Sequence, residues 1–193
     1  VSSAGCWRWP RRALTGRVGS RELRKPVKVE ADPRTSVPEA DLVAQRDLGL
    51  ALNELRGRVA TMVNRSNDLI RQLAALAENL RQNAPNEKAT LAQADSALSE
   101  VTKLRDEKLA RPLPGLGYRQ YPRLQEEVNS LYGMVTSPLS KPTEAQVQRH
   151  GELLNEVAEV ERELQSIVDG RIARLNQMLR TLPHVLVPGG RIM

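Results

Sequence analysis

The sequence predicts an all-α protein, an elongated antiparallel bundle with three legs, built from four helices and preceded by one short β-strand. Apolar residues recur at alternating spacings of four and three through the first long segment, which is the heptad pattern of packed helices. The chain has no Phe and only 3% aromatic residues. Because aromatic side chains usually fill thick globular cores, packing by Leu, Val and Ala indicates thin seams between helices.

The N-terminal part carries one strand-like segment. Residues 1–21 show neither a helical stripe nor strand alternation, and we interpret them as a disordered or mistranslated stub. Residues 22–34 follow as a remnant strand and an Asp-Pro-Arg junction, with Leu23, Val27 and Val29 alternating and Pro26 favouring an edge position. Since one strand is not stable alone, we expect its partner strands to lie upstream of this chain.

The first helix is predicted from about residue 38 to residue 83. Ser36 is a suitable cap, Pro38 fits the first turn, and Glu39 favours the positive end of the helix. The segment Asn83-Ala84-Pro85-Asn86 ends it. Its apolar stripe contains one polar break, at Ser66, and consists of Leu48, Leu52, Leu55, Val59, Met62, Ser66, Leu69, Leu73, Leu76 and Leu80.

Three further helices are predicted at about residues 86–111, 122–137 and 142–182, and residues 184–193 form a flexible tail. Three Pro and two Gly make 111–122 a corner rather than a helix. The inward positions of the second helix are Leu91, Ala94, Leu98, Val101 and Leu104 or Leu109. Those of the third helix are Leu124, Val128, Leu131 and Val135. Those of the last helix are Leu153, Val157, Val160, Leu164, Val168, Ile172, Leu175, Leu179 and Leu182.

The helix lengths predict how residues 36–183 assemble. The second and third helices together match the first and the last in length, so they form one middle leg, broken at the corner. Short turns favour an antiparallel bundle within the chain, with helices crossing near 20°. The alternative is a coiled coil between chains that uses the Leu48–Leu80 seam.

The charge of the chain is unevenly distributed. The formal net charge is +6, and residues 1–34 contain nine Lys or Arg and three Asp or Glu, so the remaining residues are neutral. The helical body is therefore not expected to bind nucleic acid. The alternative is that the basic N-terminal segment binds the phosphate backbone. The sequence contains neither an apolar run long enough to span a membrane nor an N-terminal signal core.

We predict no catalytic, cofactor-binding or metal-binding residues in this chain, and hence no enzyme within it. His150 and His184 lack a converging set of ligands, and Cys6 lies in the stub. Glu159 and Glu163 share a helix face near Arg162, which indicates a solvated, ion-paired surface rather than acid–base chemistry. No phosphate-binding, dinucleotide-binding or paired-cysteine motif is present.

The tyrosines offer a weaker functional signal. Tyr118 and Tyr121 bracket the corner, so we expect them to hold that loop against the bundle. Exposed aromatic side chains also anchor protein contacts, which makes a binding role at the corner the alternative.

Residues 22–182 resemble the C-terminal region of bacterial sortilin-like proteins with BNR (Asp-box) repeats, often labelled glycosyl hydrolases. The residues that carry the resemblance are Val27, Val29, Asp32, Pro33, Arg34, Asp41, Leu42, Gln45, Leu48 and Leu52, and later Tyr121, Pro122, Leu124, Leu131, Val135, Pro142, Thr143 and Leu153. In that family a β-propeller and a small β-sandwich precede C-terminal helices. The propeller and its carboxylates are absent here, so no catalytic residue carries over.

The resemblance implies a non-catalytic helical module of an exported propeller protein, acting as a scaffold or binding a partner. Its partners would be the upstream sandwich or propeller of the same parent chain, a separate protein, or a second copy. The parent would be extracellular or periplasmic. The alternative is a free-standing coiled-coil module for protein–protein interaction.

Overall fold

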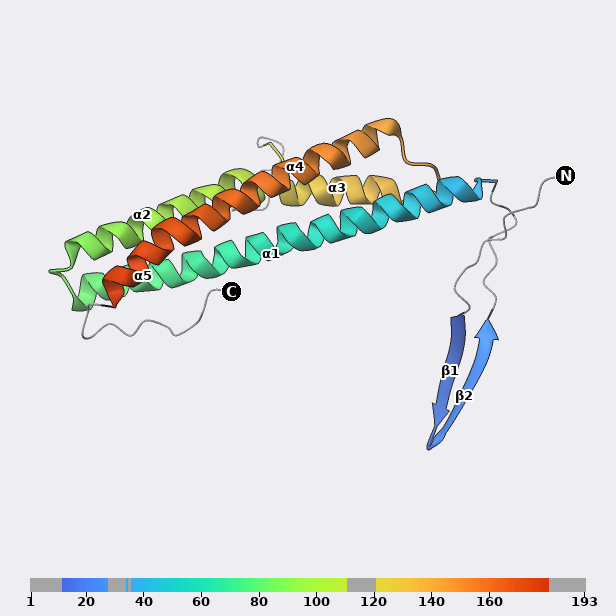
Figure 1. The fold of residues 1–193 in the computed structure, drawn as a ribbon, viewed down its shortest axis with the longest axis horizontal. Coiled ribbons are helices and arrows are strands. Elements are labelled where there is room, and N and C mark those ends of the chain that lie inside the picture. Colours follow the sequence, from blue (N-terminus) through green and yellow to red (C-terminus); the bar gives the residue numbers. More distant parts are fainter. Residues whose placement is uncertain (1–11, 28–33, 35, 111–120, 181–193) are drawn as a thin grey trace. The chain divides into compact units, whose positions relative to one another are not determined.

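The computed structural model describes residues 12–27, 34, 36–110 and 121–180 of the chain (Figure 1). The chain consists of two compact units, Val1–Pro38 and Glu39–Met193. The described strands belong to the first unit, and the helices belong to the second.

The first unit contains a β-hairpin. Strands β1 (Arg12–Val18) and β2 (Arg21–Val27) pair antiparallel, with Val18 opposite Arg21, so the loop is Gly19-Ser20. Gly19 has a φ of +58°, which Gly adopts without strain and which two-residue hairpin loops require. The prediction of a lone strand preceded by an unstructured stub is therefore wrong for residues 12–18. The signal for this hairpin in the sequence is the Gly19-Ser20 pair rather than apolar alternation.

The hairpin is held weakly by its own side chains. Glu22 pairs with Arg17 at 3.2 Å and with Arg24 at 2.7 Å. Val18 and Leu23 are 78% and 73% exposed, so among the described residues they contribute no apolar core. A two-stranded ribbon of this kind is marginally stable by itself. Residues 28–31, the rest of the predicted strand, lie outside the described residues.

The second unit is the predicted bundle with three legs. The first leg is the helix α1 (Glu39–Asn83). The middle leg consists of α2 (Lys88–Leu104), the π-helical turn η1 (Arg105–Leu109) and, after the corner, α3 (Leu124–Thr136). The last leg consists of α4 (Glu144–Ile167), the π-helical turn η3 (Val168–Ile172) and α5 (Ala173–Leu179). Figure 1 shows α2 and α3 returning along α1, and α4 and α5 running back in the direction of α1. The all-α fold class and the four continuous helical segments are confirmed.

The core follows the heptad stripe of α1. Leu52, Leu55 and Val59 are at most 1% exposed, and the stripe continues through buried Leu69, Leu73 and Leu80. Near its end Ala77 takes the buried position, and Leu76 packs at its edge. The seam that a coiled coil between chains would use is thus covered by helices of the same chain.

Both π-helical turns correct the phase of an apolar stripe. Leu104 and Leu109 are five residues apart and are both buried, because the i→i+5 period of a π turn places such residues on one face. In the last leg, Leu164, Val168 and Ile172 are spaced by four and four, which is one residue more than a heptad allows. The turn η3 absorbs that residue and returns Ile172 and Leu175 to the core.

The corner of the middle leg is closed by an arginine. The Nε of Arg123 donates a hydrogen bond of 2.8 Å to the carbonyl oxygen of Asp106, so α3 begins beside the end of η1. Tyr121 is 87% exposed, so the prediction that it holds the corner against the bundle is wrong. Tyr118 and most of the corner lie outside the described residues.

The far end of the middle leg is closed by a buried glutamine of α1. The Nε2 of Gln45 donates to the carbonyl oxygen of Val135 at 2.8 Å and also to that of Pro138. Carbonyls in the last turn of a helix have no partner within that helix, so Gln45 satisfies the end of α3. Close packing accompanies this contact, because a Cβ added at Gly49 would lie 3.2 Å from Thr136 Cγ2.

Candidate docking groove

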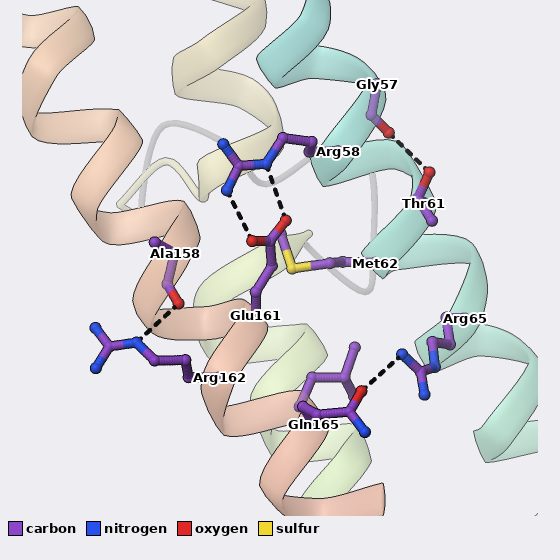
Figure 2. A pocket seen from close by; sticks show the side chains of 10 residues that line it. Gly57, Arg58, Thr61, Met62, Arg65, Ala158, Glu161, Arg162 and Gln165 are labelled. Carbon is purple, nitrogen blue, oxygen red and sulfur yellow. Dashed lines mark hydrogen bonds and ion pairs between the residues drawn. The ribbon is translucent and has the colours of Figure 1, made fainter. Parts of the chain in front are cut away.

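A groove opens between the two parallel legs, α1 and α4. Its volume is about 750 Å³. Ten residues line it: Gly57, Arg58, Thr61, Met62, Arg65, Ala158, Glu161, Arg162, Leu164 and Gln165. Figure 2 shows Arg58 facing Glu161 and Arg65 facing Gln165 across it, whereas the guanidinium of Arg162 points away from α1. Along this side, α1 makes a less extensive contact with α4 than it makes with α2 and α3.

The floor of the groove is apolar and its walls are low. Met62 and Leu164, 5% and 2% exposed, are core residues that close its bottom. Gly57, Thr61 and Ala158 stand on the walls, and a Cβ added at Gly57 would meet no atom within 4 Å. Small side chains at these positions leave room for another chain to approach the backbone of both helices.

Two polar bridges cross the groove from α1 to α4. The guanidinium of Arg58 donates two hydrogen bonds to the carboxylate of Glu161, from Nε to Oε1 at 3.0 Å and from Nη2 to Oε2 at 2.7 Å. This hydrogen bonding raises the pKa of Arg58. One turn further along α4, Arg65 Nη1 donates to the amide oxygen of Gln165 at 3.2 Å (Figure 2).

Two arginines in the groove have no carboxylate partner among the described residues. Arg65 bonds only the neutral amide of Gln165, and its buried Nε has no acceptor. Arg162 is exposed, and its Nε donates to the carbonyl oxygen of Ala158 at 3.2 Å. The lining therefore contains two arginines that no carboxylate of the described residues compensates, Arg65 between the two helices and Arg162 on the outer side of α4.

Exposed apolar side chains continue from the groove toward the start of α4. Val147, Leu154 and Glu161 are seven residues apart, so they lie on the same flank of the helix. Val147 is 54% exposed and Leu154 is 36% exposed. In the sequence, this feature is a second apolar heptad position outside the core stripe, and it was not among the predicted functional residues.

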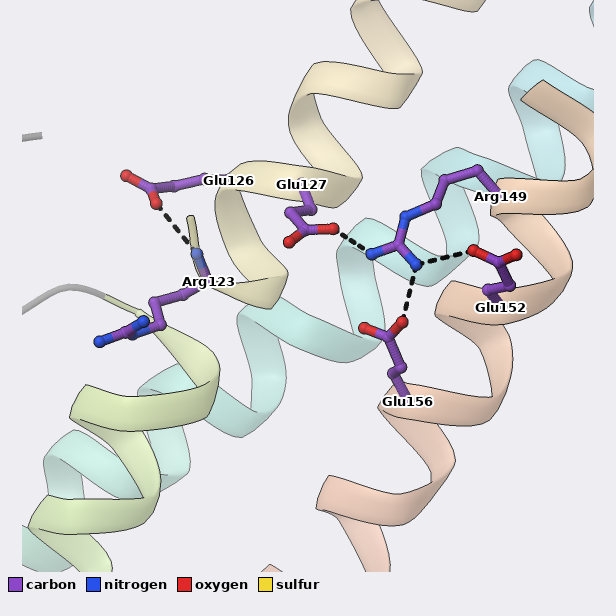
Figure 3. Close-up of polar contacts among 6 residues, drawn as sticks. All are labelled: Arg123, Glu126, Glu127, Arg149, Glu152 and Glu156. Carbon is purple, nitrogen blue, oxygen red and sulfur yellow. Dashed lines mark hydrogen bonds and ion pairs between the residues drawn. The ribbon is translucent and has the colours of Figure 1, made fainter. Parts of the chain in front are cut away.

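A cluster of charged residues joins α3 to α4 (Figure 3). Arg149 donates to Glu152 at 3.0 Å and to Glu156 at 2.7 Å on its own helix, and also to Glu127 of α3. The guanidinium lowers the pKa of Glu152, and the carboxylates raise that of Arg149. These ion pairs connect α3 to α4 and fix the two helices together.

The residues that the sequence singled out are scattered in the structure. His150 lies on α4, where burial lowers its pKa and leaves its Nε2 without a hydrogen-bond partner among the described residues. Glu159 and Glu163 are both exposed, and Glu163 forms an ion pair with Lys108. Tyr132 of α3, for which the sequence indicated no role, lies under the guanidinium of Arg56, whose carbon is 4.3 Å from the ring centre. Cys6 and His184 lie outside the described residues.

Within the part of the chain that the structure describes, no three His, Cys, Asp or Glu side chains lie close enough together to hold a metal ion. None of the helices described there combines the length and the hydropathy of a membrane span. Comparisons of the chain with protein-family models, with curated proteins and with solved structures found no match.

Proposed function

We propose that the helical unit is a non-catalytic scaffold that docks a protein partner. The observation that carries this proposal is the α1–α4 groove, which has an apolar floor and two arginines without a carboxylate partner among the described residues. Protein-binding surfaces combine exposed apolar area with charges that select the partner. The long aliphatic core gives such a surface a rigid support.

We further propose that this module belongs to an exported protein with a sortilin-like propeller. The resemblance of the Asp32-Pro33-Arg34 junction and of the helices after it supports this assignment. The hairpin is compatible with it, because a two-stranded ribbon with exposed Val18 and Leu23 gains stability from further strands beside it. The location would then be extracellular or periplasmic.

The DNA upstream of the codon for Val1, read in all three frames, tests the assignment to a propeller protein. We expect codons for Asp-box repeats that end close to the hairpin. A start codon preceded by unrelated sequence would refute the assignment to a propeller protein. The docking role of the groove would then be judged by the binding experiment below.

A further inference from the structure

We infer that the α1–α4 groove binds an acidic amphipathic helix. This inference deepens the proposed docking role and rests on it, since it names the chemistry of the partner. The recognition mode is a helix lying in a groove, with its apolar face inward and its carboxylates at the rim. Four observations on the described residues lead to this partner.

The first observation is the shape of the site. Two parallel helices, α1 and α4, form the walls, and Met62 and Leu164 form the floor. A further helix laid along such a groove would convert three legs into the four-helix arrangement that buries apolar faces efficiently. The small residues Gly57 and Ala158 allow its backbone to approach closely.

The second observation is the apolar extension of the groove. Val147 and Leu154 continue along the α1-facing flank of α4, seven residues apart, and both are exposed. Heptad-spaced apolar residues match the stripe of an amphipathic helix and do not match an irregular peptide. The partner is therefore expected to present Leu or Val at the same repeat.

The third observation is charge. Arg58 is neutralised by Glu161, but Arg65 and Arg162 have no carboxylate partner among the described residues. The buried Nε of Arg65 lacks an acceptor, and such a group is destabilising until one is supplied. Glutamate or aspartate on the flanks of the incoming helix would supply acceptors to both guanidinium groups.

The fourth observation separates this partner from a second copy of the chain. The groove lining contains three arginines and one glutamate, so it is net positive. Pairing two copies through this face about a two-fold axis would bring like charges together. Charge complementarity thus favours an acidic partner over self-association.

The experiment uses the full chain and a synthetic probe. The probe is a fluorescein-labelled helical peptide of about three heptads, with Leu at the a and d positions and Glu on the flanks. A matched peptide carries Lys in place of Glu. Fluorescence anisotropy measures binding to the wild-type chain and to Arg162→Glu, Arg65→Glu and Leu154→Ser. The matched control is Arg71→Glu, which reverses an exposed charge of α1 outside the groove lining.

We expect the acidic peptide to bind the wild type and the Arg71→Glu control equally. Arg162→Glu should weaken binding about tenfold or more, and added salt should weaken binding to the wild type. Leu154→Ser should weaken binding without changing its salt dependence. Because Arg162 and Leu154 are surface residues, circular dichroism should show that both variants keep their helices.

Three results would overturn the inference. One is no binding of the acidic peptide to the folded wild type, and another is equal binding of the Lys peptide. The third is a dimer in sedimentation velocity that Leu154→Ser dissociates, which would make a second copy the occupant. None of these results depends on the upstream DNA, so a failure of this inference is distinguishable from a failure of the assignment to a propeller protein.

Discussion

Ser66 places a hydroxyl group in the middle of an aliphatic core. Its side chain is 0% exposed, and its Oγ has no hydrogen-bond partner among the described residues. A buried polar group without a partner lowers stability, because it loses its hydrogen bonds to water on folding. Ser66 also occupies a heptad position at which most other turns of α1 carry an apolar residue. The position therefore contributes to packing, and the hydroxyl group has no structural role there.

We predict that Ser66→Ala raises the free energy of unfolding by about 1 kcal/mol. The change removes the unsatisfied hydroxyl and leaves a small residue that favours the helix. Urea denaturation followed by circular dichroism measures it. Thr61→Ala is the control, since that exposed hydroxyl already bonds the carbonyl oxygen of Gly57, and a change within about 0.5 kcal/mol is expected there. A loss of stability in Ser66→Ala would show that the hydroxyl is bonded in the folded chain.

His150 is the second residue whose environment has a measurable consequence. Burial lowers its pKa below the ordinary value near 6.5. Protons therefore bind the unfolded chain more readily than the folded one. The contribution of this residue to stability is complete above about pH 7 and decreases as the pH falls below about 6.5 toward the lower pKa of the folded chain.

We predict that His150→Gln removes this pH dependence. Thermal melts of the wild type and the variant from pH 7.5 to pH 5 test it, and the difference between the two curves isolates His150 from the carboxylates and from His184. The melting temperature of the wild type should fall faster over this range. Parallel curves would contradict the burial of the imidazole.

At the scale of the helix, α1 has the most regular repeat of the chain. Leu69 lies midway along its buried stripe and is 3% exposed, whereas Leu50 on the same helix is 63% exposed. The two leucines differ in environment but hardly in local helix propensity, so they form a matched pair for measuring what the seam contributes.

We predict that Leu69→Asp lowers the free energy of unfolding by about 3 to 5 kcal/mol, because it places a charge without a partner in the core and removes apolar contacts. Leu50→Asp should change it by no more than about 0.5 kcal/mol. Chemical denaturation of both variants measures the difference. Equal effects at the two positions would refute the assignment of the core face of α1.

At the scale of the whole molecule, the two units are stabilised very differently. The helical unit has a continuous aliphatic core, whereas the described part of the hairpin has exposed Val18 and Leu23 and two exposed ion pairs. Exposed ion pairs contribute little, so the hairpin is not expected to support the bundle.

We predict that a chain containing residues 36–183 alone folds as the full chain does. Its helical melting temperature should lie within about 2 °C of the value for the full chain, since none of the described core residues is removed and a 1 kcal/mol change would shift it by roughly 2–8 °C. Differential scanning calorimetry provides the comparison. A drop much larger than this would mean that the N-terminal unit contributes to the stability of the helices.

The heptad repeat predicted most of the helical fold. It located the helices to within a few residues, selected the buried face of α1, and identified the middle leg as two helices separated by a Pro- and Gly-rich corner. These features are local, because the spacing of apolar residues, Pro and Gly determines helix phase and helix ends wherever the chain lies. The two π-helical turns were not predicted, although the five-residue step from Leu104 to Leu109 and the extra residue before Ile172 carry their signal.

The hairpin and the groove were missed for different reasons. The hairpin depends on a two-residue turn at Gly19-Ser20, where Gly19 adopts a positive φ. The strands on either side of this turn show little alternation of apolar and polar residues, so the usual sequence pattern of a strand is weak. The groove depends on the distance between two helices that are far apart in sequence. No local pattern shows that α4 packs less closely on α1 than the middle leg does, or that Arg65 is left without an acceptor.

The sequence by itself thus determined where the helices lie and which face of each is buried, because both follow from short-range periodicity and the hydrophobic effect. Only the tertiary structure decided which charges find partners. Arg58 meets Glu161 and Arg149 meets Glu127, while Arg65 and Arg162 meet no carboxylate among the described residues. Pairing of charges depends on the register and separation of whole helices, and those are set by how the complete core packs.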